Sequence, residues 1–299
     1  MSERRTTSRQ WREFRSGDVI RDTFTLYFRH FGAIMGVTLM VFLPTLIPSA
    51  LAVAGAFGES DLKYFQTLTT VSLVASLVQF LIIQPLANAI LCLALFHALQ
   101  DRPITMRQSA AAGLRRVPAV LGVLICQAGI FLAFTLGVVI VGAAAGGIIG
   151  AAGGGRDAGI LVGILVGIVS LWPGLWILIG MCVAVPATVV ERVGPSASVV
   201  RSFALCRGLR MRLLLVSIVV WSVPVVLGFA VGVIQAVMQA KNPTQSMCFG
   251  IVSQDVLSLF TTSLGAVLMT VCYYHLRCAK EGLDVEALAS AFDEESPAQ

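Results

Sequence analysis

Residues 16–57 read SGDVIRDTFTLYFRHFGAIMGVTLMVFLPTLIPSALAVAGAF, a charged amphipathic stretch followed at once by a long apolar run. Apolar residues recur in the first part at helical spacing, namely Ile20, Phe24, Tyr27, Phe28 and Phe31. This pattern predicts a helix in the lipid headgroup layer that leads into a membrane-crossing helix. Comparable basic stretches begin near Thr105, 87 residues after Asp18, and near Ser196, 91 residues after Thr105. The chain therefore repeats one unit three times.

The composition is that of a membrane protein. Hydrophobic residues make up 57% of the chain, charged residues only 12%, and the mean hydropathy is +0.87. Soluble domains are about one quarter charged, and a membrane span needs about 20 apolar residues. Six runs are long enough: 31–57, 71–99, 117–152, 158–190, 213–238 and 251–276.

We therefore predict an all-α polytopic membrane protein with six transmembrane helices. They would form three hairpins, each preceded by a cytoplasmic amphipathic interfacial helix. The single domain would cover residues 16–288, with hairpin units at about 16–99, 105–190 and 196–276. Residues 1–15 would be a disordered basic N-terminus, and residues 289–299 a disordered acidic tail.

The cations predict the orientation. Eighteen of the 21 Lys and Arg residues fall before the first run, in the second and fourth connections or after the sixth run. The positive-inside rule then places both termini in the cytoplasm. This distribution favours anionic membrane lipids as partners over nucleic acid, because no separate basic domain exists. The candidate headgroup contacts are Arg21, Arg29, Arg115, Arg116, Arg210 and Arg212.

The middle unit carries two glycine series with a period of four, a glycine-zipper pattern. They comprise the packing candidates Gly142, Gly146, Gly150, Gly159, Gly163 and Gly167, together with Gly154 before the turn. Such series let two helices approach closely. Packing within the hairpin is favoured, because a tight turn joins the two series. A homo-oligomer interface or a membrane-protein partner is the alternative.

Prolines and a few amides interrupt the apolar runs. Pro44, Pro48, Pro85, Pro173 and Pro224 are expected to lie in helix interiors and to kink them. The candidate intramembrane polar cluster is Gln79, Gln84, Asn88 and Gln127. Interhelical hydrogen bonding is the favoured role for these amides. If they surrounded a wet cavity, the chain would instead be a transporter or transporter subunit for a lipid-like or amphipathic solute.

The sequence offers little for catalysis. It has no nucleophile elbow, no phosphate-binding loop with lysine and no paired carboxylates. His30, His97 and His275 fall near one predicted membrane face, but no cysteine or carboxylate spacing reinforces a metal site. We therefore predict no catalytic residues, no metal and no cofactor.

One charged set stands out near the predicted cytoplasmic helix ends. Glu191 follows the fourth run, Arg201 lies in the third basic stretch, and Arg277, Glu281 and Asp284 follow the sixth run. These five residues predict a charge clamp that holds the hairpins together where their cytoplasmic ends converge.

Three segments carry a family resemblance: 16–32 (SGDVIRDTFTLYFRHFG), 186–212 (PATVVERVGPSASVVRSFALCRGLRMR) and 273–288 (YYHLRCAKEGLDVEAL). With them the chain resembles the bacterial family named for the glycerophosphoryl diester phosphodiesterase membrane domain. The most specific matches are Glu191, Arg201, Ser202, Gly208, Arg277, Glu281, Gly282 and Asp284. The family pattern usually has an acidic residue where His275 stands, so a charge pair there is not carried over.

The resemblance implies a membrane region alone. The catalytic barrel that accompanies this region in some family members is absent from these 299 residues, so the hydrolase activity is not carried over. With this resemblance we expect a non-enzymatic integral protein of the bacterial inner membrane, of unassigned biochemistry, which interacts with lipids or scaffolds a partner through its basic cytoplasmic face.

Overall fold

The computed structural model describes residues 14–56, 70, 73–74, 77–79, 83–99 and 106–281. The elements in this part of the chain are helical, which confirms the all-α class. They are α1 (Ser16–Arg29), α2 (Phe31–Ala56), α4 (Gln84–Leu99), α5 (Met106–Ile149), the short π-helical turn η2 (Gly150–Gly154), α6 (Gly155–Gly180), α7 (Ala184–Glu191), α8 (Pro195–Cys206), α9 (Arg210–Lys241) and α10 (Pro243–Glu281).

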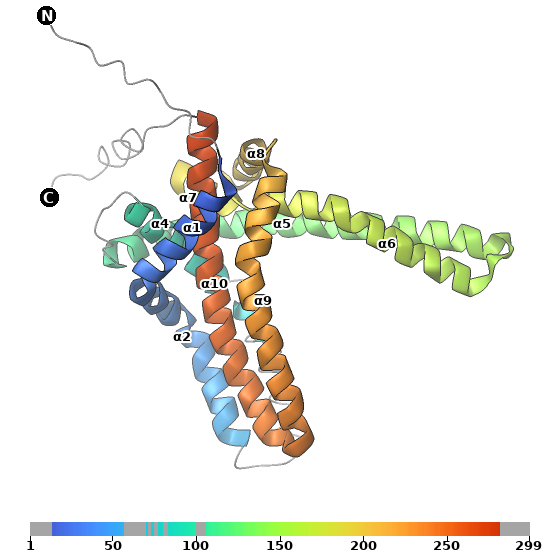
Figure 1. The fold of residues 1–299 in the computed structure, drawn as a ribbon, viewed down its shortest axis with the longest axis horizontal. Helices are drawn as coiled ribbons and strands as arrows, with labels where there is room; N and C mark the ends of the chain where they lie inside the picture. The colour runs from blue at the N-terminus through green and yellow to red at the C-terminus, as the bar shows by residue number, and fades with distance from the viewer. Residues whose placement is uncertain are drawn as a thin grey trace, which may run out of the picture.

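Helix α10 is the centre of the main bundle. It lies between α2 and α9 and packs on both, and α1 and α4 pack against its other faces (Figure 1). Its inner face carries fully buried side chains such as Leu264, Tyr273 and Leu276. They form one core cluster with Leu213 of α9 and Leu95 of α4. Because α10 touches most of the other helices, its position sets where their ends meet.

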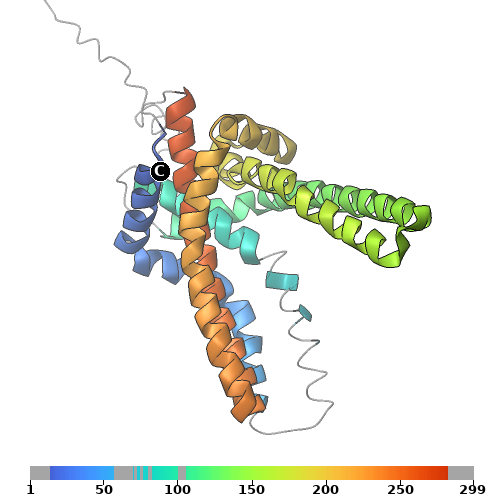
Figure 2. The ribbon, with the colours of Figure 1, turned by 45° about the vertical axis from the view of Figure 1, so that its right-hand side comes forward.

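Helices α5 and α6 form a long hairpin that projects sideways from this bundle (Figures 1 and 2). Side chains along the hairpin are apolar and exposed on several faces, as at Ile140, Leu161 and Leu165. The hairpin turns through Gly153 and Gly155, whose φ angles of 99° and 73° lie in the left-handed region that glycine enters at low cost. An apolar arm of this kind is compatible with membrane embedding.

Glycines face each other across this hairpin. A Cβ added to Gly146 would lie 2.5 Å from the carbonyl oxygen of Gly159, and one on Gly159 would lie 2.6 Å from that of Gly146. Gly142 and Gly163 oppose each other at about contact distance, at 3.7–3.8 Å by the same measure. Gly150 lies beside the turn, and Gly167 has open space around its Cα. Helices α5 and α6 therefore approach most closely where both have a glycine, which has no side chain.

Long apolar helices match the expected membrane class. Those long and apolar enough to cross a membrane lie at Phe31–Leu51, Arg116–Glu191, Arg210–Lys241 and Thr244–Glu281, the second of these covering α5, α6 and α7. The apolar helix Gln84–Leu95 is shorter, and most of residues 71–82 lie outside the described part. The count of six spans in three hairpins stays a prediction.

The three expected surface helices differ from one another. The first is the separate helix α1, and the third is the separate helix α8. The second is not separate, because residues 106–116 are the first turns of α5, which continues without a break to Ile149. Pro118, which could have ended a helix here, lies inside α5.

Helix α1 buries a stripe that matches the expected one only in part, since Ile20 and Phe24 are partly buried against the core. Val19, Thr23, Leu26 and Tyr27 are buried against α9 and α10, whereas Phe28 is 69% exposed. The two stripes share Tyr27, whose hydroxyl lies 3.0 Å from the Ser263 hydroxyl of α10. The protein core, rather than lipid, therefore selects the inner face of α1.

The expected proline kinks have two outcomes. Pro44, Pro48, Pro173 and Pro224 lie inside α2, α6 and α9, as predicted. Pro85 is the second residue of α4 but directly follows the π-helical residue Ile83, and residues 80–82 lie outside the described part, so a kink at Pro85 stays a prediction.

Candidate functional site

Three helices place charged side chains at one end of the main bundle. Helix α7 ends at Glu191, because Arg192 takes a left-handed conformation with φ of 56°. Helix α8 then begins at Pro195, a favourable first residue for a helix. This sharp reversal lays α8 against α7 and brings Arg201 over Glu191, beside the last turns of α10.

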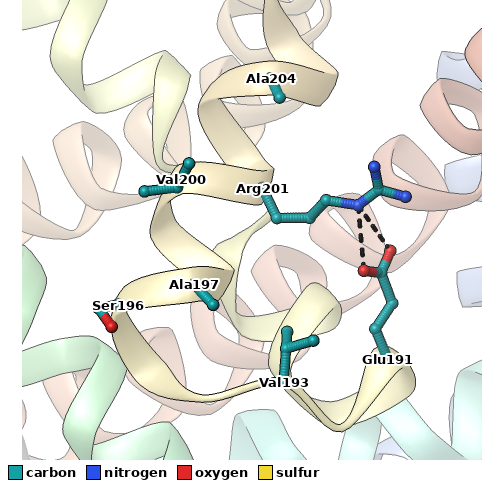
Figure 3. A pocket seen from close by; sticks show the side chains of 7 residues that line it. All are labelled: Glu191, Val193, Ser196, Ala197, Val200, Arg201 and Ala204. Carbon is teal, nitrogen blue, oxygen red and sulfur yellow. Dashed lines mark hydrogen bonds and ion pairs between the residues drawn. The ribbon is translucent and has the colours of Figure 1, made fainter.

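The charged side chains form one connected network. The Arg201 Nε donates to both carboxylate oxygens of Glu191, at 3.2 and 3.0 Å (Figure 3), and its Nη2 donates to Glu281. The Arg277 Nε donates to the other Glu281 oxygen at 2.9 Å and lies 3.9 Å from Glu191. The Tyr273 hydroxyl donates to Glu191 at 2.8 Å and accepts from Arg277 Nη1 at 3.3 Å. We call these five residues the charge network.

The charge network is largely shielded from solvent. The side chains of Glu191 and Arg277 are 13% and 17% exposed, and that of Arg201 is 34% exposed. Burial acts to lower the pKa of Arg201, but the hydrogen bonds and charges of Glu191 and Glu281 outweigh it and raise that pKa. Isolated surface ion pairs contribute about 0–1 kcal/mol, whereas hydrogen bonds to charged groups contribute about 1.5–3 kcal/mol. The network joins α7, α8 and α10 more firmly than one exposed pair would.

The structure thus brings together four of the five predicted clamp residues: Glu191, Arg201, Arg277 and Glu281. Asp284 lies outside the described residues. Sequence reasoning missed Tyr273, although it lies four residues before Arg277 and hence on the same face of α10. It also missed Lys280, whose ammonium donates to the carbonyl oxygens of Ala204 and Arg207 at the end of α8, at 2.6 and 2.7 Å.

A second polar link joins α1 to α10. The His275 Nε2 lies 3.1 Å from a carboxylate oxygen of Asp22. The family pattern gave no reason to expect a pair at His275. The partner comes from a helix more than 250 residues away in sequence, so no local spacing could have indicated it.

The six predicted headgroup arginines differ in their surroundings. The Arg21 side chain is 81% exposed, and Arg29 is also exposed. Arg116 is half-buried, and the side chain of Arg115 lies outside the described part. Two others have protein partners. The Arg210 guanidinium lies 5.6 Å from the Trp176 ring centre and 5.5 Å from that of Phe203, and Arg212 donates to the Phe14 carbonyl oxygen at 2.7 Å.

The predicted intramembrane polar residues bond to different elements. Gln84 accepts a hydrogen bond from Thr262 of α10 at 3.1 Å. The Gln127 amide donates to the carbonyl oxygen of Met181, in the break between α6 and α7, at 3.0 Å. Gln79 and Asn88 are partly buried. The two amides whose bonds are known therefore fasten helices together and do not point to one shared partner.

An open groove borders the charge network. It has a volume of about 530 Å³ and is lined by Glu191, Val193, Ser196, Ala197, Val200, Arg201 and Ala204 (Figure 3). Apart from the Glu191–Arg201 pair and one hydroxyl, its lining consists of small apolar side chains. The arrangement suits docking of an apolar surface beside charges.

Within the described part of the chain, no group of three His, Cys, Asp or Glu side chains is placed to hold a metal ion. Comparisons with models of protein families, with curated proteins and with solved structures found no match for this chain. The resemblance to the phosphodiesterase membrane-domain family stays a prediction. The fold defines the class of the protein: it is a helical protein whose long apolar helices are compatible with membrane embedding.

Proposed function

We propose that this chain is a non-enzymatic integral protein of a bacterial inner membrane, which binds anionic lipid headgroups through a basic cytoplasmic face. The observation that carries the proposal is the one-sided distribution of cations, 18 of 21 on one predicted side. Helix α1, helix α8, the start of α9 and the end of α10 lie toward one end of the main bundle (Figures 1 and 2). The basic residues of these four segments therefore lie toward that end of the bundle.

Helix lengths fit a membrane crossing with projecting ends. Helices α9 and α10 have 32 and 39 residues, which correspond to about 48 and 58 Å at the usual rise per residue. The hydrocarbon layer is about 30 Å thick. Arg210 and Arg212 at the start of α9 would then lie at headgroup depth, and Trp172 and Trp176 beside them are typical of the interface.

Arginine is well suited to the proposed ligand. Its planar guanidinium donates two parallel hydrogen bonds to a phosphate, and each cation near an anionic surface contributes about 1 kcal/mol. Arg21 and Arg29 of α1 are exposed, so they are the best candidates for direct headgroup contact. Arg210 and Arg212 already have protein partners and would act mainly by their charge. Transport is the weaker alternative, because Gln84 and Gln127 each bond to a neighbouring segment.

Native mass spectrometry with retained lipids tests this proposal. The double variant Arg21→Gln/Arg29→Gln should bind phosphatidylglycerol roughly 10–30-fold more weakly than the wild type, because it removes two exposed cations. The matched control is Arg156→Gln/Lys241→Gln, which removes two exposed cations from the arm tip and the far end of α9. Equal losses in both variants, or no loss in either, would refute headgroup binding by the basic face.

A further inference from the structure

The outer face of α8 is apolar, and the charged pair Glu191–Arg201 borders it on one side. Val200 is 69% exposed, and Ala197 and Ala204 lie one turn before and after it. Figure 3 shows Arg201 extending from α8 toward Glu191, with Val193 between Glu191 and Ala197. A helix with one apolar stripe and acidic flanks would be complementary to this groove.

The chain beyond α10 has that composition. Residues 283–292 read LDVEALASAF and lie outside the described residues. Val285, Leu288, Ala289 and Phe292 follow the i, i+3, i+4, i+7 spacing, which would place them on one face of a helix. Residues 282–299 contain five acidic residues and no Lys or Arg: Asp284, Glu286, Asp293, Glu294 and Glu295.

The charge network holds the end of α10 next to the groove. Glu281, the last described residue, pairs with Arg201, which also lines the groove. A ten-residue helix is about 15 Å long, and the nine residues 196–204 of α8 span about 14 Å, so the lengths match. The exposed Arg192 follows the last residue of α7, and the exposed Arg207 follows the last residue of α8. There they would face the acidic flanks of the segment.

We propose that residues 283–292 form an amphipathic helix that docks in the groove on α8, with Val285, Leu288 and Phe292 against Ala197, Val200 and Ala204. The acidic flanks of the segment then neutralise cations of the basic face. A lipid, or the same segment of a second copy of the chain, is the competing occupant.

Photo-crosslinking of the full-length protein in neutral-lipid nanodiscs distinguishes the occupants. The photoreactive residue p-benzoylphenylalanine replaces Val200, and the products are mapped by mass spectrometry on a mixture of ¹⁵N-labelled and unlabelled protein. We expect the main product to join residue 200 to residues 283–292 of the same chain. Products with lipid alone, products between labelled and unlabelled chains, or no product with this segment would overturn the proposal. The same probe at Phe229, which is 74% exposed on α9, should give no product with this segment.

Substitutions in the segment provide a second readout. Leu288→Asp/Phe292→Asp should lower the yield of this product about tenfold, because two large apolar side chains lose their buried site. The matched control is Ser290→Asp, which adds a negative charge on the opposite face and should change the yield less than about twofold. Equal loss in the two variants, or no loss in the first, would overturn the proposed orientation.

Discussion

Removing the charge of Glu191 tests the charge network most sharply. Glu191→Gln keeps the size of the side chain and its hydrogen bond from Tyr273, which is 2.8 Å long in the wild type. It removes the charge facing Arg201 and Arg277, and it turns an amide N–H group toward the Arg201 donor. Half-buried charge-assisted hydrogen bonds are worth about 1.5–3 kcal/mol, so we expect a loss of about 2 kcal/mol in the free energy of unfolding.

A double-mutant cycle isolates the pair. Glu191→Gln, Arg201→Gln and the double variant are unfolded by SDS titration in mixed micelles, and we expect a coupling energy of about 1–2 kcal/mol. The control is Arg21→Gln, whose side chain is 81% exposed and 3.9 Å from Asp22, and which should change stability by less than about 0.5 kcal/mol. If the two single effects add to within about 0.5 kcal/mol, Glu191 and Arg201 are not coupled and the reasoning is wrong.

The other predictions concern helix packing and use the same SDS titration. Gly146→Ala should destabilise the protein by about 2 kcal/mol, because the new Cβ would lie 2.5 Å from a carbonyl oxygen of α6. The control Gly147→Ala places its Cβ in open space and should not destabilise the protein. Equal effects of the two variants would refute the close approach of α5 and α6. Ser202→Ala should cost about 1 kcal/mol, since its hydroxyl donates to the Gly180 carbonyl oxygen at 2.7 Å, and no loss would show that this bond is unimportant. Burial raises the pKa of Tyr27 above its ordinary value of 10.0, so the unfolded state loses this proton first and stability should fall as the pH rises through about 10. Tyr27→Phe should remove that part of the pH dependence, and an unchanged profile would exclude Tyr27 as its source.

Local sequence signals predicted the features that depend on few residues. The spacing of apolar side chains in residues 20–31 predicted a helix, and α1 covers most of this stretch. Four residues of the charge set could be predicted to meet because few carboxylates occur near the predicted cytoplasmic ends, so the arginines there had few candidate partners besides Glu191 and Glu281.

Features that depend on distant segments were missed. No signal in residues 105–116 tells a surface helix from the first turns of a longer one, and α5 runs through them. The pair between Asp22 and His275 depends on how α1 crosses α10. The stripe that α1 buries likewise depends on how α1 packs against α9 and α10. The sideways direction of the α5–α6 hairpin depends on the break at residues 181–183, where Gln127 and Ser202 bond to backbone carbonyls.

Photoactivatable lipids test the central claim, that the basic end of the bundle binds anionic headgroups. The purified protein is placed in nanodiscs that contain phosphatidylglycerol or phosphatidylethanolamine with a diazirine in the headgroup, and the labelled peptides are mapped. We predict that the anionic probe labels α1 and residues 207–212 several times more than the zwitterionic probe does, with little difference near residues 239–245. Equal labelling by the two lipids at α1 and residues 207–212, or a preference of the anionic probe for residues 239–245, would contradict the proposed function.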